Sequence, residues 1–267
     1  MSDRTNNTIT FTTDFGLKSS YVAQMKAVAL SMTNASLIDI SHSINPQNIT
    51  EGAFVLMTSV PFFPSGSVHV AVIDPGVGSD RRGLVIATPS QILVGPDNGL
   101  LIPTAKKLGN FMVYEIENKD LFRSKVSNTF HGRDIFTPVA AHIINGLHFA
   151  EIGPIVNDYV DFDFNQYKIN SKTAVGRIIY IDDFGNIITS IDGINLRSVL
   201  DFDTTVMLFI GEKQVKLPFI RTYSNVKPKS MLATIGSSNF LEISINKGNA
   251  ASKLKVKYGD KVKILFG

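Results

Sequence analysis

Three motifs place an aspartate beside a glycine at the end of an apolar, strand-like run. They are Asp14-Phe15-Gly16, Asp74-Pro75-Gly76-Val77-Gly78 and Asp97-Asn98-Gly99. In open α/β sheets, ligands bind outside the carboxyl ends of strands, where glycine lets loops approach closely. Each motif alone is better explained as a turn, because Asp and Gly are common turn residues. Three motifs in similar positions favour a site on one shared rim.

The Asp74 motif is followed at once by Arg81 and Arg82. A guanidinium near a partly buried carboxylate keeps it ionised and fixes its plane, which suits a group that positions or polarises water. The alternative is a solvated arginine pair on a surface turn, and spacing alone slightly favours that alternative.

His131 lies in the segment Thr129 to Asp134, just before a helix that the pattern predicts over Ile135 to Ile144 with Asp134 near its cap. A histidine on a loop, flanked by glycine and charged residues, is suited to proton handling near neutral pH. It is therefore the strongest histidine candidate. The other four are weaker candidates, namely His42, His69, His142 and His148. Of these, His69 and His142 lie inside apolar strand or helix patterns and are expected to be structural.

Cofactor motifs do not accompany these residues. The chain has no HExxH or HxH spacing for a metal and no GxGxxG or Walker A motif for a nucleotide. Asp182, Phe184 and Asn186 could together bind a purine or an amino acid, although a plain hairpin corner explains them better. Gly236 to Asn239 fits an anion-binding backbone nest or an ordinary turn. These residues alone indicate a hydrolase-like site on an α/β domain.

The composition narrows the functional classes. The 267 residues carry no cysteine and a formal net charge of only +3, with Lys and Arg spread along the chain. This excludes disulfides and thiolate chemistry, and it disfavours nucleic acid as a partner. The uncharged stretch Gly52 to Ile73 is interrupted by Pro61 and Pro64, so we expect no membrane span. With no secretory signal pattern at its start, we expect a cytoplasmic protein.

The pattern of apolar residues predicts an α/β fold with two domains. Strand-like and helix-like segments alternate in residues 1–165, which indicates an α/β layered domain. Residues 173–267 show short strand-like runs between turns, which indicates a smaller all-β, barrel-like domain. Strands are expected at Thr8–Thr13, Leu37–Ile40, Ser67–Ile73, Leu84–Ala87, Ile92–Gly95, Ala174–Ile181, Asn186–Ile191, Val206–Ile210, Val215–Ile220, Phe240–Ile245 and Val262–Phe266.

Seven motifs occur in order over almost the whole chain: Thr13 to Gly16, Asp74 to Gly78, Arg81-Arg82, Pro96 to Gly99, Thr129 to Asp134, Asp182 to Asn186 and Phe240 to Ile243. Together they resemble the S-adenosyl-L-methionine (SAM) hydroxide adenosyltransferases, which are related to SAM-dependent fluorinases and chlorinases. The resemblance implies hydrolysis of SAM to adenosine and L-methionine without a metal or organic cofactor. It also implies a homotrimer whose sites lie between subunits.

The same resemblance implies a role for each matching residue. The catalytic residues would be Asp74, Arg81 and His131. The substrate-binding residues would be Asp14 for the ribose, Phe184 and Asn186 for the adenine, Asp182 and Ser237 for the methionine amino group, and also Phe130 and Ser238. Ser238 stands where fluorinases carry a carboxylate-binding arginine. Two alternatives remain, namely a SAM-dependent halogenase and a non-catalytic protein that binds adenosine or SAM.

Overall fold

The chain folds into two compact units. The computed structural model describes residues 7–267, so the first six residues of the predicted α/β domain lie outside the described part. One unit ends at Phe162, and the other runs from Asp163 to Gly267. Each unit has its own hydrophobic core.

The first unit is built on a mixed six-stranded sheet with the order β2-β1-β3-β5-β4-β6. Strands β1, β2, β3 and β5 run parallel to one another, whereas β4 pairs antiparallel with both of its neighbours, β5 and β6. Every residue of the central strands β1 and β3 is buried, as expected for parallel strands covered on both faces. The bounds are β1 (Thr8–Thr13), β2 (Ser36–Ser41), β3 (Val68–Val72), β4 (Gly83–Ala87), β5 (Ile92–Pro96) and β6 (Met112–Glu115).

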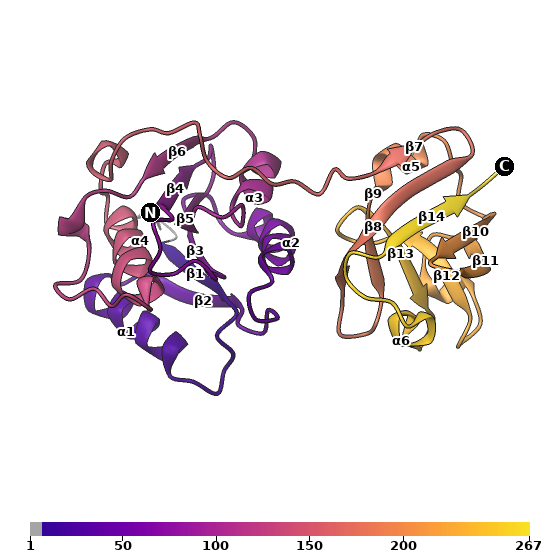
Figure 1. Ribbon diagram of the computed structural model, residues 1–267, viewed down its shortest axis with the longest axis horizontal. Coiled ribbons are helices and arrows are strands. Elements are labelled where there is room, and N and C mark those ends of the chain that lie inside the picture. The colour runs from indigo at the N-terminus through magenta and orange to yellow at the C-terminus, as the bar shows by residue number, and fades with distance from the viewer. Residues whose placement is uncertain (1–6) are drawn as a thin grey trace, which may run out of the picture. The chain divides into compact units, whose positions relative to one another are not determined.

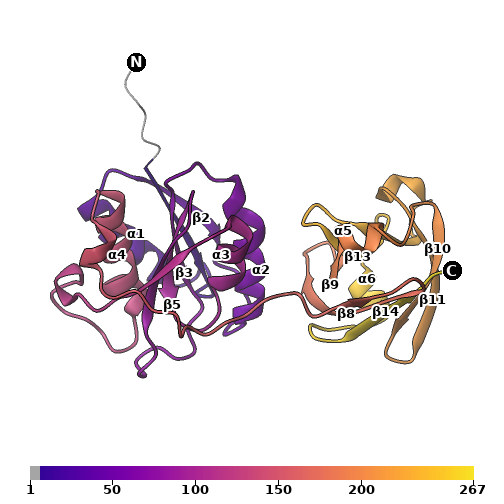
Figure 2. The same ribbon diagram turned by 90° about the horizontal axis from the view of Figure 1, so that it is seen from above.

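Helices cover both faces of this sheet. Figures 1 and 2 show α1 and α4 together on one face and α2 and α3 together on the other. The unit is therefore a three-layer α/β structure. The helices are α1 (Tyr21–Met32), α2 (Ile49–Ser59), α3 (Ile102–Leu108) and α4 (Thr137–Ile144), with shorter turns η1 (Val60–Phe62), η2 (Lys119–Leu121), η3 (Gly132–Phe136) and η4 (Phe149–Glu151).

The second unit contains a closed β-barrel of seven strands. Its sheet has the order β14-β10-β11-β12-β13-β9-β8-β7, and an additional pairing of β14 with β8 closes the ring. The two-residue connection Gly211-Glu212 joins β10 to β11 as predicted. The elements are β7 (Lys168–Ile169), β8 (Thr173–Ile181), β9 (Ile187–Asp192), α5 (Gly193–Arg197), β10 (Thr204–Ile210), β11 (Lys213–Phe219), η5 (Tyr223–Asn225), β12 (Met231–Ile235), β13 (Phe240–Ile245), α6 (Ala250–Leu254) and β14 (Lys261–Leu265).

The mixed α/β fold with a barrel in the C-terminal region is confirmed, whereas the predicted start of the helix at Ile135 is wrong. The helix predicted from Ile135 is preceded by a π-helical turn that begins at Gly132, and Asp134 lies inside that turn rather than at a cap. Pro138 explains the difference, because it has no N–H for the carbonyl of Asp134. That carbonyl instead accepts a hydrogen bond from the backbone N–H of Arg123 at 3.0 Å.

Six strands and α-helices were not among the predicted elements, namely β6, β7, β12, α3, α5 and α6. Across the described residues, none of the helices combines the length and apolar character needed to cross a membrane.

Candidate active site

Four of the predicted site residues line one depression of about 280 Å³ in the first unit. Asp14, Asp74, Phe130 and His131 all face it. Asp14 follows β1 and Asp74 follows β3, and these strands are parallel neighbours. Their carboxyl ends therefore meet at one edge of the sheet, as the sequence predicted for a ligand site.

Arg81 holds the carboxylate of Asp74 from behind this depression. Its Nε lies 3.1 and 3.0 Å from the two carboxylate oxygens, and its Nη2 donates to Oδ2 at 2.5 Å. The side chains of Asp74 and Arg81 are only 4% and 12% exposed. A solvated arginine at this position is therefore the wrong interpretation, and the charge-assisted pair fixes the plane of the carboxylate.

The same guanidinium also determines which nitrogen of His131 carries a proton. Arg81 Nη2 lies 2.9 Å from Nδ1 of His131, and a guanidinium can only donate. Nδ1 must accept, so the neutral ring carries its proton on Nε2. Burial and the charge of Arg81 lower the pKa of His131, with Asp74 and Asp134 opposing in part. The site thus combines a carboxylate acceptor with a neutral histidine N–H donor, which can hold a water between them.

The π-helical turn η3 supports this pair from below. The guanidinium carbon of Arg81 lies 5.1 Å from the ring centroid of Phe136, which is fully buried. His131 immediately precedes the turn. One short segment therefore places the histidine and provides the aromatic surface on which the arginine rests.

Asp14 is oriented by the segment that joins β2 to α2. Its Oδ2 accepts a hydrogen bond from the backbone N–H of Gln47 at 2.7 Å, and Gln47 adopts a left-handed φ of 64°. The backbone N–H of Gly16 donates to the carbonyl of His42 at 2.8 Å. Within residues 7–267, no backbone N–H donates to the second oxygen of Asp14, which leaves this oxygen available to a ligand hydroxyl.

Asp97 follows β5 at the same edge, but it does not line the depression. Arg82 donates to its Oδ2 at 2.8 and 3.0 Å, and the backbone N–H of Val160 donates to its Oδ1 at 2.8 Å. Arg82 also contacts Asp158 at 2.9 Å. The prediction of three acids on one rim holds for position only, since Asp97 and Arg82 anchor the last segment of the first unit.

The turn after Asp74 depends on a glycine. Gly78 has a φ of 80°, and a Cβ added there would stand 2.5 Å from the backbone oxygen of Asn128. We expect Gly78→Ala to lower the free energy of unfolding by about 1–3 kcal/mol and to reduce activity, because the turn must move away from the loop that carries His131. Thermal melting and turnover measure both effects.

Gly66→Ala is the matched control for this prediction. Gly66 has a similar φ of 85°, yet nothing lies within 4 Å of a Cβ added there. The control should therefore lose stability through backbone strain but keep the turnover of the wild-type protein. Equal activity of both variants would contradict the close packing of the two loops as a requirement.

A second depression of about 490 Å³ lies on the β-barrel unit, and Asp182, Phe184 and Asn186 line it together. Tyr223 lines it as well, and this residue was missed by the sequence interpretation. Its hydroxyl donates to the buried carboxylate of Glu242 at 2.6 Å. Burial and this carboxylate raise the pKa of Tyr223, so the phenol stays protonated. The exposed ring of Phe184 and the ring of Tyr223 offer this depression two aromatic surfaces.

Asp182 also organises the hairpin corner in which it stands. Its Oδ1 accepts from the backbone N–H groups of Phe184 at 3.0 Å and Asn186 at 2.8 Å, and its Oδ2 accepts from Asn186 Nδ2 at 2.8 Å. The interpretation of this segment as a hairpin turn is thus correct for the backbone of residues 182–186. The contact of Asn186 Nδ2 with Asp182 also fixes the Asn186 amide at the depression. Of the described residues, Ser237 is exposed and Ser238 half-buried, and neither lines this depression.

The remaining histidines do not join either depression. His69 is fully buried in β3, where Nδ1 lies 2.7 Å from Thr10 Oγ1 and Nε2 lies 3.2 Å from Gln91 Oε1. Burial lowers the pKa of His69 to about 4, so it is a neutral core residue, as predicted. The described part of the chain contains no cluster of three acidic or histidine side chains that could hold a metal ion.

Comparison with known proteins adds the family context. Residues 9–153 match the SAM hydroxide adenosyltransferase N-terminal domain, and residues 176–263 match the C-terminal domain of the same family. An (R)-S-adenosyl-L-methionine hydrolase from Methanocaldococcus jannaschii is 41% identical, over 100% of this chain and 98% of its own length. A protein of the same description from Salinispora tropica is 35% identical, over 97% and 98%.

A crystal structure of another protein and a more distant enzyme are also similar to this chain. An uncharacterized conserved protein from Thermotoga maritima superposes with a TM-score of 0.91 at 37% identity, covering 96% of this chain and 99% of the other. A fluorinase from Actinopolyspora mzabensis is more distant, at 24% identity over 96% of both chains.

Proposed function

The chain belongs to the SAM hydroxide adenosyltransferase family, and from this membership we infer that it is a hydrolase that converts SAM to adenosine and L-methionine. The observation that carries the chemistry is the Asp74, Arg81 and His131 cluster at the depression in the first unit. In the reaction, water forms a bond to C5′ as the bond from C5′ to sulfur breaks. The sulfur keeps the electron pair as methionine, and one proton is released.

We propose that placement of the water is the main task of the site. A sulfonium is already a good leaving group, so an in-line displacement needs no acid at sulfur and no metal or organic cofactor. Asp74 accepts a hydrogen bond from the water and takes its proton. His131 donates a hydrogen bond from its Nε2–H to the water oxygen and thereby orients the water. Arg81 holds the side chains of Asp74 and His131 in position through its hydrogen bonds to both.

The other residues would bind the substrate. Asp14 would hold the ribose hydroxyls with its free oxygen, since a carboxylate can accept two hydrogen bonds. Phe130 would line the reacting end of the depression. Phe184 and Asn186 would bind the adenine. Ser237 and Ser238, together with Asp182, would bind the methionine end, in the homotrimer with sites between subunits that the resemblance implies.

We also propose a stereochemical preference. The names of the relatives specify the (R) form of SAM, and since L-methionine fixes the α-carbon, the label describes the sulfonium centre. Inversion at sulfur moves the methyl group relative to the two larger substituents. A site that aligns water, C5′ and sulfur should therefore accept one epimer much better than the other.

The test is incubation of each SAM epimer with purified protein in oxygen-18 water, without added metal. We expect adenosine labelled at its 5′-oxygen, methionine in equal amount, and faster consumption of the (R) epimer. Unlabelled adenosine, or methylthioadenosine as the product, would rule out the proposed reaction. Halide-dependent formation of 5′-haloadenosine would instead support a halogenase.

The pH dependence should report His131. The ring must be neutral to accept the N–H of Arg81, and protonation would place a second cation against that guanidinium. Because the pKa of His131 lies below its usual 6.5, we expect kcat/KM to be flat near neutral pH and to fall as the pH drops through that lowered pKa. A fall of activity that begins above pH 6.5 would contradict this assignment.

A further inference from the structure

The loop between η2 and η3 carries His131. The residues that hold this loop in place, centred on Asp134, have no role in the reaction as described so far. This loop, residues 122–131, presents Thr129, Phe130 and His131 to the depression. Most of its other residues are exposed. The side chain of Asp134 lies directly behind it and is fully buried, which is unusual for an acid.

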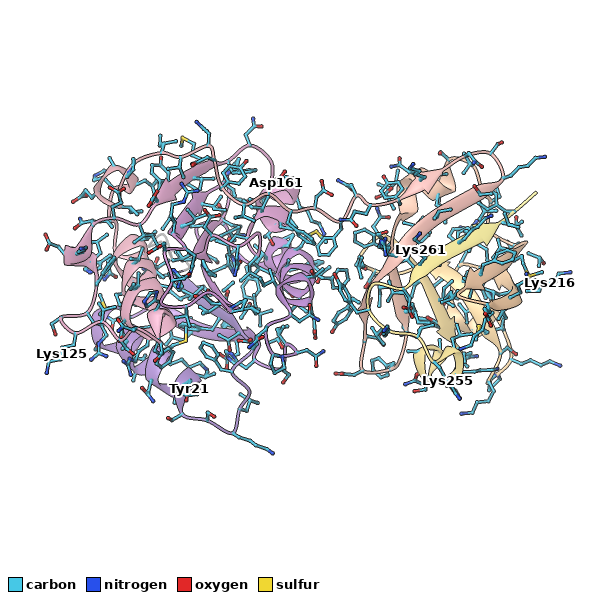
Figure 3. The ribbon with its side chains drawn as sticks, viewed as in Figure 1. Tyr21, Lys125, Asp161, Lys216, Lys255 and Lys261 are labelled. Atoms are coloured by element: carbon cyan, nitrogen blue, oxygen red, sulfur yellow. The ribbon has the colours of Figure 1, made fainter. Side chains whose placement is uncertain are left out.

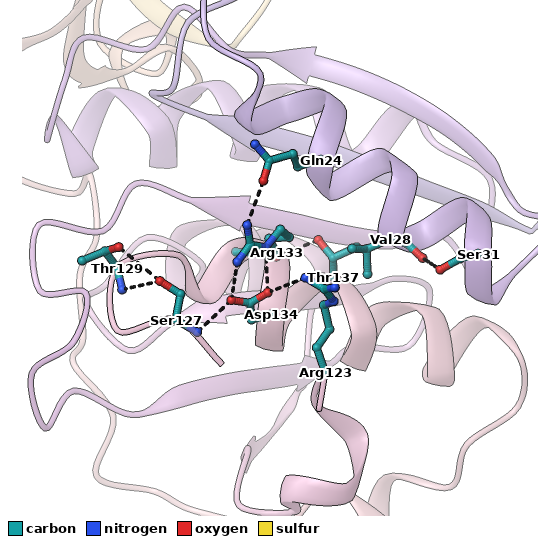
Figure 4. A network of polar contacts seen from close by, with 10 residues as sticks. Gln24, Val28, Ser31, Arg123, Ser127, Thr129, Arg133, Asp134 and Thr137 are labelled. Atoms are coloured by element: carbon teal, nitrogen blue, oxygen red, sulfur yellow. Dashed lines mark hydrogen bonds and ion pairs between the residues drawn. The ribbon is translucent and has the colours of Figure 1, made fainter. Parts of the chain in front are cut away.

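Four donors converge on the carboxylate of Asp134 (Figure 4). Arg133 donates through Nε to Oδ1 at 2.7 Å and through Nη2 to Oδ2 at 2.8 Å. Arg123 Nη1 reaches Oδ1 at 3.1 Å, and the backbone N–H of Ser127 reaches Oδ2 at 2.9 Å. Burial alone would raise the pKa of Asp134, but the hydrogen bonds from Arg133, Ser127 and Arg123 outweigh it and lower the pKa.

The backbone of Asp134 closes the same loop at both ends. Its N–H donates to the carbonyl of Phe130 at 3.1 Å, and its carbonyl accepts from the N–H of Arg123 at 3.0 Å. Side chain and backbone together thus bind the loop at its start, its middle and its end. The loop has little freedom to move without breaking one of these contacts.

Arg133 extends the cluster to the depression itself. Its Nη1 donates to Gln24 Oε1 on α1 at 2.8 Å, and its guanidinium carbon lies 4.8 Å from the ring centroid of Phe130. Phe130 is one of the residues that line the depression. The position of this ring therefore depends on an arginine whose own position is set by Asp134.

On its opposite side the loop contacts the turn that follows Asp74. The close approach of Asn128 to Gly78 leaves no room for a Cβ. The loop thus lies between the Asp134 carboxylate and the turn that carries the proton acceptor. A shift on the Asp134 side would be transmitted to the spacing between His131 and Arg81.

Stability alone is a weak reason for this arrangement. Burying a carboxylate with two arginines costs desolvation free energy, and apolar residues of similar volume often stabilise a core equally well or better. Such an ionic cluster does provide fixed directions, because the planar guanidinium and carboxylate meet in defined geometries.

We propose that Asp134 is a positioning residue for the hydrolysis of SAM. It fixes the loop of residues 122–131 so that His131 can contact both Arg81 and the attacking water. This inference rests on the proposed function. It assigns Asp134 no contact with substrate, since its carboxylate is occupied by protein donors.

The charge of Asp134 should also act on His131 directly. Arg81, Asp74 and Asp134 act electrostatically on His131, Arg133 is bound to Asp134, and Asp14 lines the same depression as the ring. Among these, the negative charge of Asp134 favours the protonated ring. Removal of that charge should therefore lower the pKa of His131, even where the fold is kept.

The experiment compares Asp134→Asn with wild-type protein and with Lys125→Ala. Lys125 lies on the same loop and extends outward from the first unit (Figure 3), so it serves as a control for loop changes in general. For Asp134→Asn we expect kcat to fall by about 10- to 100-fold and KM to stay within about threefold, because misplacement on the scale of 1 Å costs up to that factor. The acid limb of kcat/KM and the NMR titration of His131 should both move to lower pH.

Each outcome decides the inference. A folded Asp134→Asn protein with unchanged kcat and unchanged His131 titration would overturn it. So would a loss of thermal stability with kcat and the titration preserved, since that would be a purely structural role. If Asp134→Asn does not fold, Arg123→Ala decides instead, because this side chain is 45% exposed. A lower kcat at constant KM supports the inference, whereas wild-type kinetics overturns it.

The two proposals fail in different ways. If wild-type protein forms no adenosine from either SAM epimer, the proposed function is wrong. The NMR titration of His131 in Asp134→Asn still measures whether Asp134 controls that ring. If wild-type protein is active and the variants behave like it, only the positioning role is wrong.

Discussion

Replacing Asp74 with asparagine is expected to lower kcat by about 10²- to 10⁴-fold, the usual range for loss of a positioned proton acceptor. Asparagine keeps the size of the side chain but cannot take a proton from the water. It also replaces one acceptor of the Arg81 guanidinium by an amide NH₂ group that repels it. We expect KM to change much less, because the residues proposed to bind the ribose and the adenine are Asp14, Phe184 and Asn186. Adenosine formation, followed by chromatography, measures both constants.

Asp80→Asn is the matched control, because Asp80 is an exposed acid in the same segment. It should retain turnover close to wild type. Calorimetry with adenosine adds an independent check, since Asp74→Asn should still bind this product. If Asp74→Asn turned over at the wild-type rate, Asp74 would not be the acceptor. Tight adenosine binding with no turnover in wild-type protein would favour the non-catalytic binding protein.

Arg81→Lys is expected to have the second large effect, a fall in kcat of about 10²-fold or more. Lysine keeps the charge, but a single ammonium cannot reproduce the fork that donates to Asp74 through Nε and Nη2 and to His131 through Nη2. The contact of the planar guanidinium with the Phe136 ring would also be lost. The same assay applies, together with the pH profile.

Arg82→Lys is a control that differs by one position. Arg82 holds Asp97 and Asp158 rather than the depression. Its replacement should lower the melting temperature while kcat stays near the wild-type value. Equal losses of kcat in both variants would show that the two arginines act through general stability and not through the geometry at Asp74.

The strands were largely predictable because their signal is local. The run from Val68 to Val72 is short and rich in valine, and every residue in it is buried in the sheet. The π-helical turn was not predictable in the same way. Pro138 lies in the first turn of α4, where proline is favoured. The carbonyl that Pro138 leaves free finds its partner in the backbone N–H of Arg123, which is a tertiary contact.

The candidate residues were predictable by type, whereas their partners were not. Arg81 and His131 are 50 positions apart, and Arg82 and Asp158 are 76 positions apart. No local pattern separates a solvated arginine pair from two arginines that each bind a different acid. Tyr223 carried no signal either, since a tyrosine between two strands is ordinary until the fold brings it beside Asn186.

Closure of the barrel has a consequence for how the protein is made. The pairing that closes the ring joins Thr173 of β8 to Leu265 of β14, so the first strand of the ring waits for the last strand of the barrel. The second unit cannot complete its hydrogen bonding until β14 has left the ribosome. The first unit ends at Phe162 and is free to fold during synthesis. Chains truncated before β14 should therefore be degraded from the barrel side, with the α/β unit released as the resistant fragment.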